Sequence, residues 1–151
     1  MGNILKKKVL EELKERIADL KRDDLPLWGK MNISEMLCHT ADQIKISTGE
    51  IKTADNSTFK FRFFVKNFVL WGMPIPKDKI KTMPEINPHI LGSKPVSFEP
   101  DRDYLVRKIV EFTTFDESKL CPHPVFGKMT KKQWGRLIYT HLDHHLSQFG
   151  S

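Results

Sequence analysis

Four segments of this 151-residue chain repeat apolar residues with the period of an α-helix, and about fifty residues separate the second segment from the third. The four segments span residues 3–22, 33–48, 101–115 and 131–149. Residues 74–100 hold six of the nine prolines, so this part of the gap is a connector and not a helix. A connector of this length lets the helices before and after it run parallel. The sequence therefore predicts an all-α fold, a four-helix bundle with up-down-down-up topology and a long crossover between its second and third helices.

The ends of two predicted helices carry capping signals. Asn32 is followed three residues later by Glu35, and Thr130 is followed three residues later by Gln133, which is the spacing of a capping box. Gly49 follows the second segment and stops the helix, because glycine readily adopts the left-handed conformation of a C-cap. These signals fix the start of the second and fourth helices and the end of the second.

Residues 58–73, within the crossover, fit two patterns. Phe59, Phe61 and Phe63 alternate with cations, as in a strand. The residues that fit a helix cover a longer span, and they are Phe61, Phe64, Val65, Phe68 and Trp71. We therefore expect one extra short helix here. Aromatic residues between cations can also form a platform for single-stranded nucleic acid, but the same pattern is typical of a packed helix with basic edges.

The composition is that of a soluble globular protein. The net charge of +6 is mostly lysine mixed with acidic residues rather than an arginine-rich arm, so we expect no specific nucleic-acid partner. The longest uncharged run, residues 67–76, is too short to span a membrane. Cys38 and Cys121 have no CxxC spacing, which fits reduced thiols, and the charged N-terminal segment resembles no signal peptide. We expect one domain, residues 1–151, in a cytoplasmic protein with no membrane partner.

Three of the six histidines lie within five positions near the end of the chain. His141 and His145 are four residues apart, so both point to one face of the last predicted helix. That face also carries apolar residues, namely Trp134, Ile138 and Phe149. The two imidazoles therefore point towards the bundle interior, where burial costs free energy unless their nitrogens are satisfied. A pair at this spacing can chelate one metal ion, whereas His144 points to the side.

A metal ion needs a third ligand, and His39 in the middle of the second predicted helix is the candidate. Three neutral imidazoles leave coordination positions open, which is typical of a catalytic site rather than a closed structural one. Zinc, nickel and ferrous iron suit such ligands. From spacing alone a second interpretation stays open, in which His39 is a hydrogen-bonded core residue and His141 and His145 form a polar patch.

Four further residues are candidates for contacts that orient the ligands. Gln148 shares the face of the histidines on the last helix. Glu35 and Asp42 flank His39 at helical spacing, and His123 lies between two prolines in a loop that can approach the site. Each of these four also has a simpler interpretation as an ordinary helix-surface or loop residue.

Two stretches resemble a known superfamily. HPVFGKMTKKQWGRLIYTHLDHHLSQFG, residues 123–150, and WGKMNISEMLCH, residues 28–39, look like motifs of the DinB/YfiT-like superfamily of metalloenzymes. They are more closely similar to one bacterial branch of it, a domain family of unknown function. The resemblance covers nearly the whole chain, although residues 50–100 match only loosely.

The resemblance implies a site and a chemistry. By position, the superfamily's three ligands fall on His39, His141 and His145. The resemblance implies a divalent metal in the core of the bundle, a chain that is often a homodimer, and relatives that are transferases and isomerases using low-molecular-weight thiols. It assigns no residues to a substrate.

The sequence thus favours a metal-dependent enzyme acting on a small molecule, either a hydrolase or a transferase of low-molecular-weight thiols. A metal held by three imidazoles can lower the pKa of a bound water or of a bound thiol. One alternative is a non-enzymatic bundle that binds a metal or a small ligand. Another is a nucleic-acid binder that uses residues 58–73 and the lysines, for which we expect only weak and salt-sensitive binding.

Overall fold

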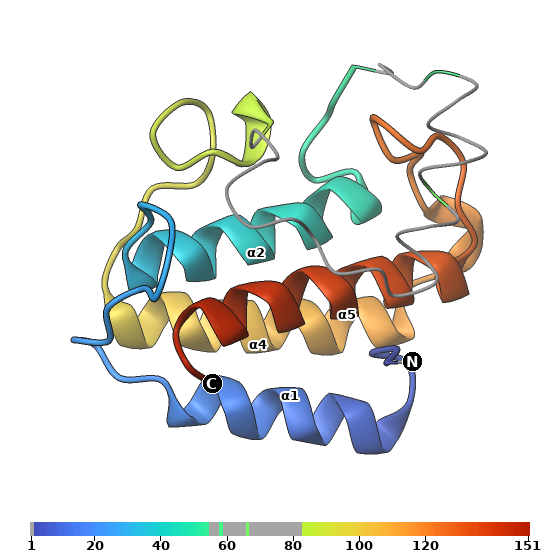
Figure 1. Ribbon diagram of the computed structural model, residues 1–151. Helices are drawn as coiled ribbons and strands as arrows, with labels where there is room; N and C mark the ends of the chain where they lie inside the picture. The colour runs from blue at the N-terminus through green and yellow to red at the C-terminus, as the bar shows by residue number, and fades with distance from the viewer. Residues whose placement is uncertain (1, 55–57, 59–65, 67–82) are drawn as a thin grey trace.

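Four helices pack together in the part of the chain that the computed structural model describes, residues 2–54, 58, 66 and 83–151 (Figure 1). They are α1 (Lys7–Asp19), α2 (Ile33–Thr48), α4 (Phe98–Thr114) and α5 (Lys131–Gln148). Two short 3-10 helices, η2 (Pro84–Ile86) and η3 (Glu117–Lys119), lie in the connections. These described residues contain no strand, so the predicted all-α bundle is confirmed. The extra helix predicted at 58–73 lies outside the described residues, apart from Thr58 and Lys66.

The helix directions follow the predicted up-down-down-up order. In Figure 1, α1 and α5 run towards the left of the view, whereas α2 and α4 run towards the right. The two helices on either side of the long crossover are therefore parallel. As a result, the first half of α2 lies at the same end of the bundle as the last half of α5, which is where the predicted ligands are.

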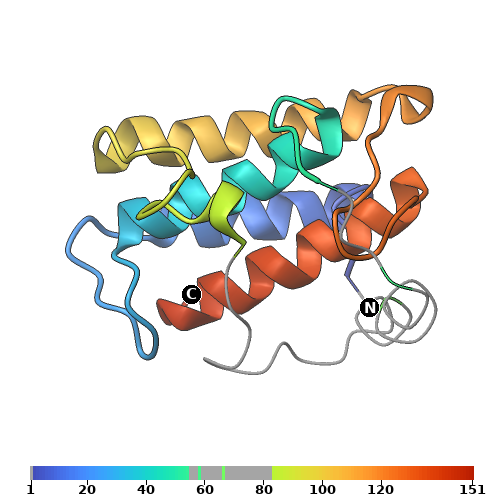
Figure 2. The same ribbon diagram turned by 90° about the horizontal axis from the view of Figure 1, so that it is seen from above.

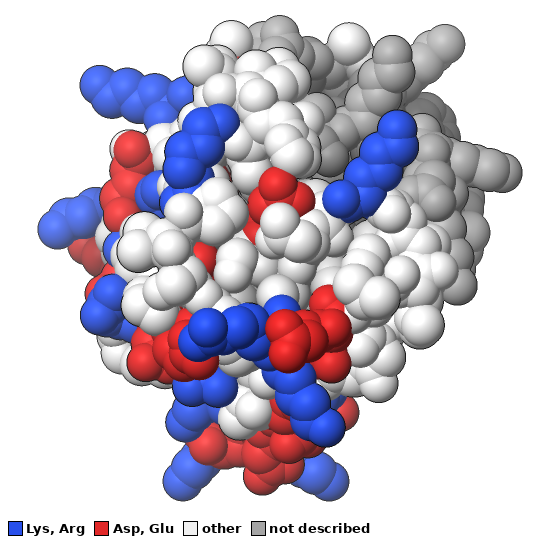
Figure 3. Space-filling view, turned by 90° about the vertical axis from the view of Figure 1, so that its left-hand side faces the viewer, with Lys and Arg blue, Asp and Glu red and all other residues white. Residues whose placement is uncertain are grey.

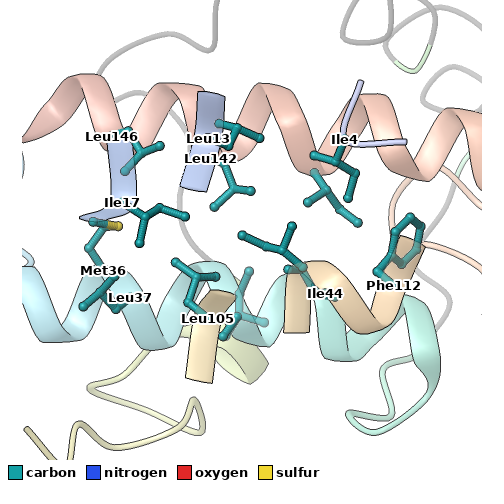
Figure 4. Close-up of a cluster of buried hydrophobic side chains, with 14 of the residues drawn as sticks. Ile4, Leu13, Ile17, Met36, Leu37, Ile44, Leu105, Phe112, Leu142 and Leu146 are labelled. Carbon is teal, nitrogen blue, oxygen red and sulfur yellow. The ribbon is translucent and has the colours of Figure 1, made fainter. Parts of the chain in front are cut away.

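The core fills the space between the helices. α1 and α2 each pack against both α4 and α5. Figure 4 shows Leu142 and Leu146 of α5 pointing towards α2, across a space that Met36 and Ile17 also enter. Side chains with no exposed surface come from all four helices, among them Leu13, Ile17, Met36, Leu37, Leu105, Ile109, Phe112, Trp134, Ile138 and Leu146. Each side chain buried in this way contributes roughly 1.5–3 kcal/mol, so the apolar stripes position the helices.

Both predicted capping boxes are present. The Asn32 side chain accepts a hydrogen bond from the backbone N–H of Glu35, whose carboxylate accepts from the N–H of Asn32 in return. Thr130 and Gln133 make the same reciprocal pair at the start of α5. Gly49 ends α2 with φ at +81°. The bounds of α2 are as predicted, and α5 ends one residue earlier than predicted.

The first helix is shorter than the predicted 3–22. Asn3 does not begin a helix, because its side chain accepts from the N–H of Leu5 and donates to the carbonyl of Lys132 on α5. The residues before α1 therefore form a turn tied to α5. At the other end, Leu20 is extended and closes the helix early.

The third bundle helix starts earlier than predicted, at Phe98 instead of Asp101. Pro100 was assigned to the connector, but it lies in the first turn of α4. A proline is tolerated there because the first N–H groups of a helix have no partner within the helix. The predicted connector 74–100 therefore extends three residues too far.

The connection before α4 passes over α2. Figures 1 and 2 both show η2 lying across the outer side of α2. The Ile86 side chain at the end of η2 is buried in the core, which anchors this connection to the bundle. The backbone of η2 is thereby held above the middle of α2, beside His39.

The surface at the end of the bundle where α1 ends and α4 begins is shown in Figure 3. Basic and acidic side chains alternate there instead of forming a patch of one sign. Arg22, three residues after the end of α1, forms an ion pair with Glu99 of α4, with 2.8 Å from Nη2 to Oε1. Separately, no helix within the described ranges has the length and apolar character needed to cross a bilayer.

Candidate metal centre

His39 is placed by α2. The capping box at Asn32 sets the start of the helix, and Met36 and Leu37 anchor the preceding turn in the core without exposed surface. His39 is itself buried, on the side of α2 that packs against α5. A neutral imidazole in this position needs a partner for each nitrogen.

His141 and His145 are placed by α5. They lie one turn apart on the face that also buries Ile138 and Leu142. His145 is buried, whereas His141 as a whole residue is half-buried. The apolar face that fixes α5 against α2 therefore aims both imidazoles at His39, as the sequence predicted.

The three imidazole rings form a compact cluster. The ring centroids of His39 and His141 are 4.7 Å apart, those of His39 and His145 are 4.8 Å apart, and those of His141 and His145 are 4.6 Å apart. One nitrogen from each ring lies within 4.8 Å of the other two. Such a group can hold one metal ion with three nitrogen ligands, as in sites where zinc-to-nitrogen distances are about 2.0–2.1 Å.

The proton on His39 is fixed by a backbone carbonyl. Nδ1 of His39 lies 2.7 Å from the carbonyl oxygen of Ile86. Because a carbonyl only accepts hydrogen bonds, Nδ1 must carry the proton. Nε2 of the neutral ring then has a free lone pair, and it points at the cluster, 3.0 Å from Nε2 of His141.

The proton on His145 is fixed in the same way through Gln148. The side-chain nitrogen of Gln148 donates to the carbonyl of Trp28, so its oxygen faces His145. That oxygen accepts from Nδ1 of His145 at 2.8 Å. Nδ1 therefore carries the proton, and Nε2 of His145 has the lone pair. A hydrogen bond from the outer nitrogen of a ligating histidine is the usual way in which a metal site orients its ring.

His141 completes the test of whether the cluster fits a metal. Its Nδ1 is enclosed and has no hydrogen-bond partner among the described residues. If Nδ1 carries the proton, the lone pairs of His39 and His141 face each other at 3.0 Å, which is repulsive without a cation. If Nε2 carries the proton instead, the buried Nδ1 is left without a donor. A metal ion between the rings removes the repulsion between these lone pairs, so the donor set fits a cation, and Nδ1 of His141 has no partner among the described residues in either case.

The electrostatics keep these imidazoles neutral. Burial, with a contribution from the neighbouring His39, lowers the pKa of His145 to about 3. Burial also lowers the pKa of His39, and it lowers the pKa of His141 well below its usual value, with His145 and His39 adding to the effect. Neutral imidazole is the form that binds metals, so no proton has to leave the cluster at neutral pH.

Of the four predicted orienting residues, only Gln148 forms a hydrogen bond with a cluster histidine. Glu35 serves in the capping box of α2 and lies 3.4 Å from the exposed imidazole of His89. Asp42 is fully buried but binds Ser93 and Lys45. The ring of His39 is oriented instead by a carbonyl from the connection.

His123 lies in the loop before α5 and is also buried. Its Nδ1 accepts hydrogen bonds from the N–H groups of Val125 and Phe126, and its ring stacks on that of Phe126. Burial lowers its pKa to about 4, and Lys66 contributes to this shift. These contacts describe a histidine that shapes its own loop.

Sequence reasoning missed the backbone groups that hold the cluster. The carbonyls of Ile86 and Trp28 fix the protons of His39 and, through Gln148, of His145. Every residue has a carbonyl, so residue type gives no signal for this role. Pro84, a good first residue for a helical turn, is the one local sign that the chain turns before Ile86.

Comparison with known proteins adds one result. The family profile described as "Protein of unknown function (DUF1569)" matches residues 3–151. Neither the curated proteins nor the solved structures contain a match to this chain. The matched range includes all three histidines of the cluster and the residues that orient them.

Proposed function

The chain belongs to the DUF1569 family, and because the function of that family is unknown, we propose one from the site itself. The chain binds one divalent transition-metal ion through the Nε2 atoms of His39, His141 and His145. It acts as a metal-dependent enzyme on a small molecule, either as a hydrolase or as a transferase of low-molecular-weight thiols.

One observation carries this proposal. The outer nitrogens of His39 and His145 donate to fixed acceptors, so the lone pairs of both rings converge on the space that His141 also faces. A core that needed only hydrogen bonds would pair these lone pairs with donors. Here the described residues place three imidazoles together and supply no donor other than His141 itself.

The donor set also limits which ions fit. Three imidazoles suit zinc, nickel or ferrous iron better than magnesium or calcium, which prefer oxygen ligands. When bound by three protein ligands, such an ion keeps open positions and supplies Lewis acidity that lowers the pKa of a coordinated water or thiol. The chain's own contribution is to hold the three rings neutral and oriented, and to surround them with the apolar core.

The proposed chemistry draws on resemblance as well as on geometry. We propose that this family is a branch of the DinB/YfiT-like superfamily. Two observations support this: the motifs at residues 28–39 and 123–150, and the parallel arrangement of α2 and α4. A low-molecular-weight thiol as the substrate and a homodimer as the assembly rest on that resemblance alone.

Metal content is the first test. The wild-type chain, expressed without a histidine tag and loaded with zinc, nickel or iron, is expected to hold one ion per chain by elemental mass spectrometry. His39→Ala, His141→Ala and His145→Ala are each expected to lose most of it. His89→Ala is the matched control, because His89 is exposed and lies outside the cluster. Equal metal in wild type and in the three cluster variants would overturn the proposal.

A second test separates an enzyme from a metal-storage or sensing protein. The cobalt-substituted chain is titrated with a small thiol, and its visible spectrum is recorded. A thiolate-to-cobalt band that saturates indicates an open coordination position, as an enzyme requires. A spectrum that neither thiols nor small anions change indicates a closed site, and the non-enzymatic alternative is then the better description.

A further inference from the structure

Two buried side chains of α2 hold the same connecting segment at two points. His39 donates to the carbonyl of Ile86, and Asp42, almost one turn later on the helix, accepts hydrogen bonds from Ser93. The metal-site proposal uses only the first of these contacts. The contact between Asp42 and Ser93 explains why the carboxylate of Asp42, which has no exposed surface, is stable in the core.

The Asp42 carboxylate is fully engaged. Oδ2 accepts from the backbone N–H of Ser93 at 2.7 Å, and Oδ1 accepts from the Ser93 hydroxyl at 2.7 Å. Nζ of Lys45 lies 2.8 Å from the same Oδ1 and donates to the Ser93 hydroxyl at 2.9 Å. Three mutually bonded groups of this kind form a stronger restraint than an exposed ion pair, because the carboxylate is fully buried and its two partners are partly buried.

The segment between the two contacts is closed on itself. The N–H groups of Ile90 and Gly92 both donate to the carbonyl of Asn87, at 2.9 and 2.8 Å, and the N–H of Leu91 donates to the carbonyl of Pro84 at 3.1 Å. A Cβ added at Gly92 would lie 2.7 Å from the carbonyl carbon of Asn87, so the backbone at Gly92 is in direct contact with the backbone at Asn87. These contacts join Gly92, next to Ser93, to Asn87, next to Ile86, so the position of Ser93 constrains that of Ile86.

We propose that Asp42 is a positioning residue of the metal site. Through Ser93 it holds segment 86–93 in place, so that the carbonyl of Ile86 keeps His39 in the Nδ1–H form with its Nε2 lone pair aimed at the metal. This inference rests on the proposed function for its role, but the effect on the His39 proton exists without any metal. Without the contact between Asp42 and Ser93, the loop shifts, the carbonyl leaves Nδ1, and His39 becomes a mixture of two tautomers.

The experiment uses Asp42→Asn and Ser93→Ala in the full chain. Glu50→Gln is the matched control, because it makes the same carboxylate-to-amide change at a residue that pairs with Lys108 beyond the other end of α2. Nitrogen NMR of the imidazoles in the metal-free protein reports the tautomer of His39. Competition with a chromogenic chelator reports the affinity for zinc.

We expect Asp42→Asn to lose the pure Nδ1–H form of His39 and to bind zinc at least tenfold more weakly, as is typical when an outer contact of a metal ligand is removed. Ser93→Ala keeps the bond from its backbone N–H to Oδ2 of Asp42, so it is expected to change both properties in the same direction but less. The control keeps both properties. Ser93→Ala loses only one hydroxyl at a half-buried position, so it is expected to fold even if Asp42→Asn does not. Variants in which His39 keeps the Nδ1–H form would overturn the positioning role. A wild type that takes up no zinc would overturn the metal proposal, and the tautomer measurement would still decide the role of Asp42.

Discussion

Nε2 of His39 lies 3.0 Å from Nε2 of His141, although 102 positions separate the two residues in the chain. Because Nδ1 of His39 is already a donor to Ile86, its Nε2 can only accept. In the metal-free chain the contact is favourable only when His141 carries its proton on Nε2. Metal binding at Nε2 requires that proton to move to Nδ1 of the same ring.

This relationship predicts a change of tautomer. Nitrogen NMR of the metal-free protein is expected to show His39 and His145 as Nδ1–H forms and His141 as the Nε2–H form. After one equivalent of zinc, all three are expected to be Nδ1–H forms. His89, outside the cluster, serves as an internal reference whose signals stay unchanged. A metal-free protein in which His141 is already Nδ1–H would contradict this account of the contact.

Removing the outer partner of His145 is expected to weaken metal binding. Gln148→Ala leaves Nδ1 of His145 without its acceptor and frees the ring to rotate, so the zinc dissociation constant should rise about 10- to 100-fold. Competition with a chromogenic chelator measures this dissociation constant. Gln133→Ala is the control, since Gln133 lies on the same helix but only caps its start. It should lower the unfolding temperature without changing zinc affinity; an equal affinity loss in both variants would mean that Gln148 acts only through stability.

The buried histidines make the metal-free fold sensitive to acid. Burial lowers the pKa of His145 to about 3 and that of His123 to about 4, whereas both titrate near 6.5 in an unfolded chain. Below about pH 6.5 the unfolded state therefore binds more protons than the folded state, and the free energy of unfolding falls as the pH falls. Each group contributes a slope of roughly 1.4 kcal/mol per pH unit.

Urea unfolding of the metal-free chain at pH 7, 6 and 5 checks this slope. The free energy of unfolding is expected to be at its maximum above about pH 6.5 and to decrease from there to pH 5. Equal stability at pH 5 and pH 7 would show that these imidazoles are protonated in the folded state after all.

Gly135, inside α5, lies so close to the turn before α1 that there is no room for a side chain at this position. A Cβ at position 135 would lie 2.5 Å from Oδ1 of Asn3, which is fixed because it accepts from the N–H of Leu5. Glycine to alanine in a helix normally gains about 1 kcal/mol, but here the clash should dominate. Gly135→Ala is expected to lower the free energy of unfolding by roughly 1–3 kcal/mol.

The double variant tests the cause. In an Asn3→Ala background the same Gly135→Ala change should cost much less, or stabilise the chain, because the fixed side chain is gone. Denaturant unfolding of the four proteins gives the coupling between the two positions. Purely additive effects would mean that Asn3 is not what excludes a side chain at position 135.

The elements that could be predicted from sequence are those with local causes. The capping boxes at Asn32 and Thr130 and the stop at Gly49 are set by residues within a few positions, and all three are present. His141 and His145 share a face because the helix period requires it. That His39 meets them follows only from the parallel course of α2 and α4, which the length of the crossover indicated.

The parts that could not be predicted depend on distant contacts. The start of α4 at Phe98 could not be predicted because of Pro100. A proline normally indicates the end of a helix, and only the structure shows that this one lies in the first turn. The turn before α1 is set by Asn3 reaching α5. Asp42 was expected beside His39 from helical spacing, but its partner Ser93 comes from a connection whose path over α2 has no periodic signal.

The acceptors that orient His39 and Gln148 are main-chain atoms of Ile86 and Trp28. Point substitution cannot delete a carbonyl, so the orienting role by itself requires no particular residue type at these two positions, although the buried side chain of Ile86 also anchors its connection to the core. An insertion or deletion in either connection would displace the carbonyl directly. Evolutionary constraint on this site is therefore expected to appear partly as a constant length of these two connections. In an alignment, insertions and deletions would be rare there even where the residue types vary.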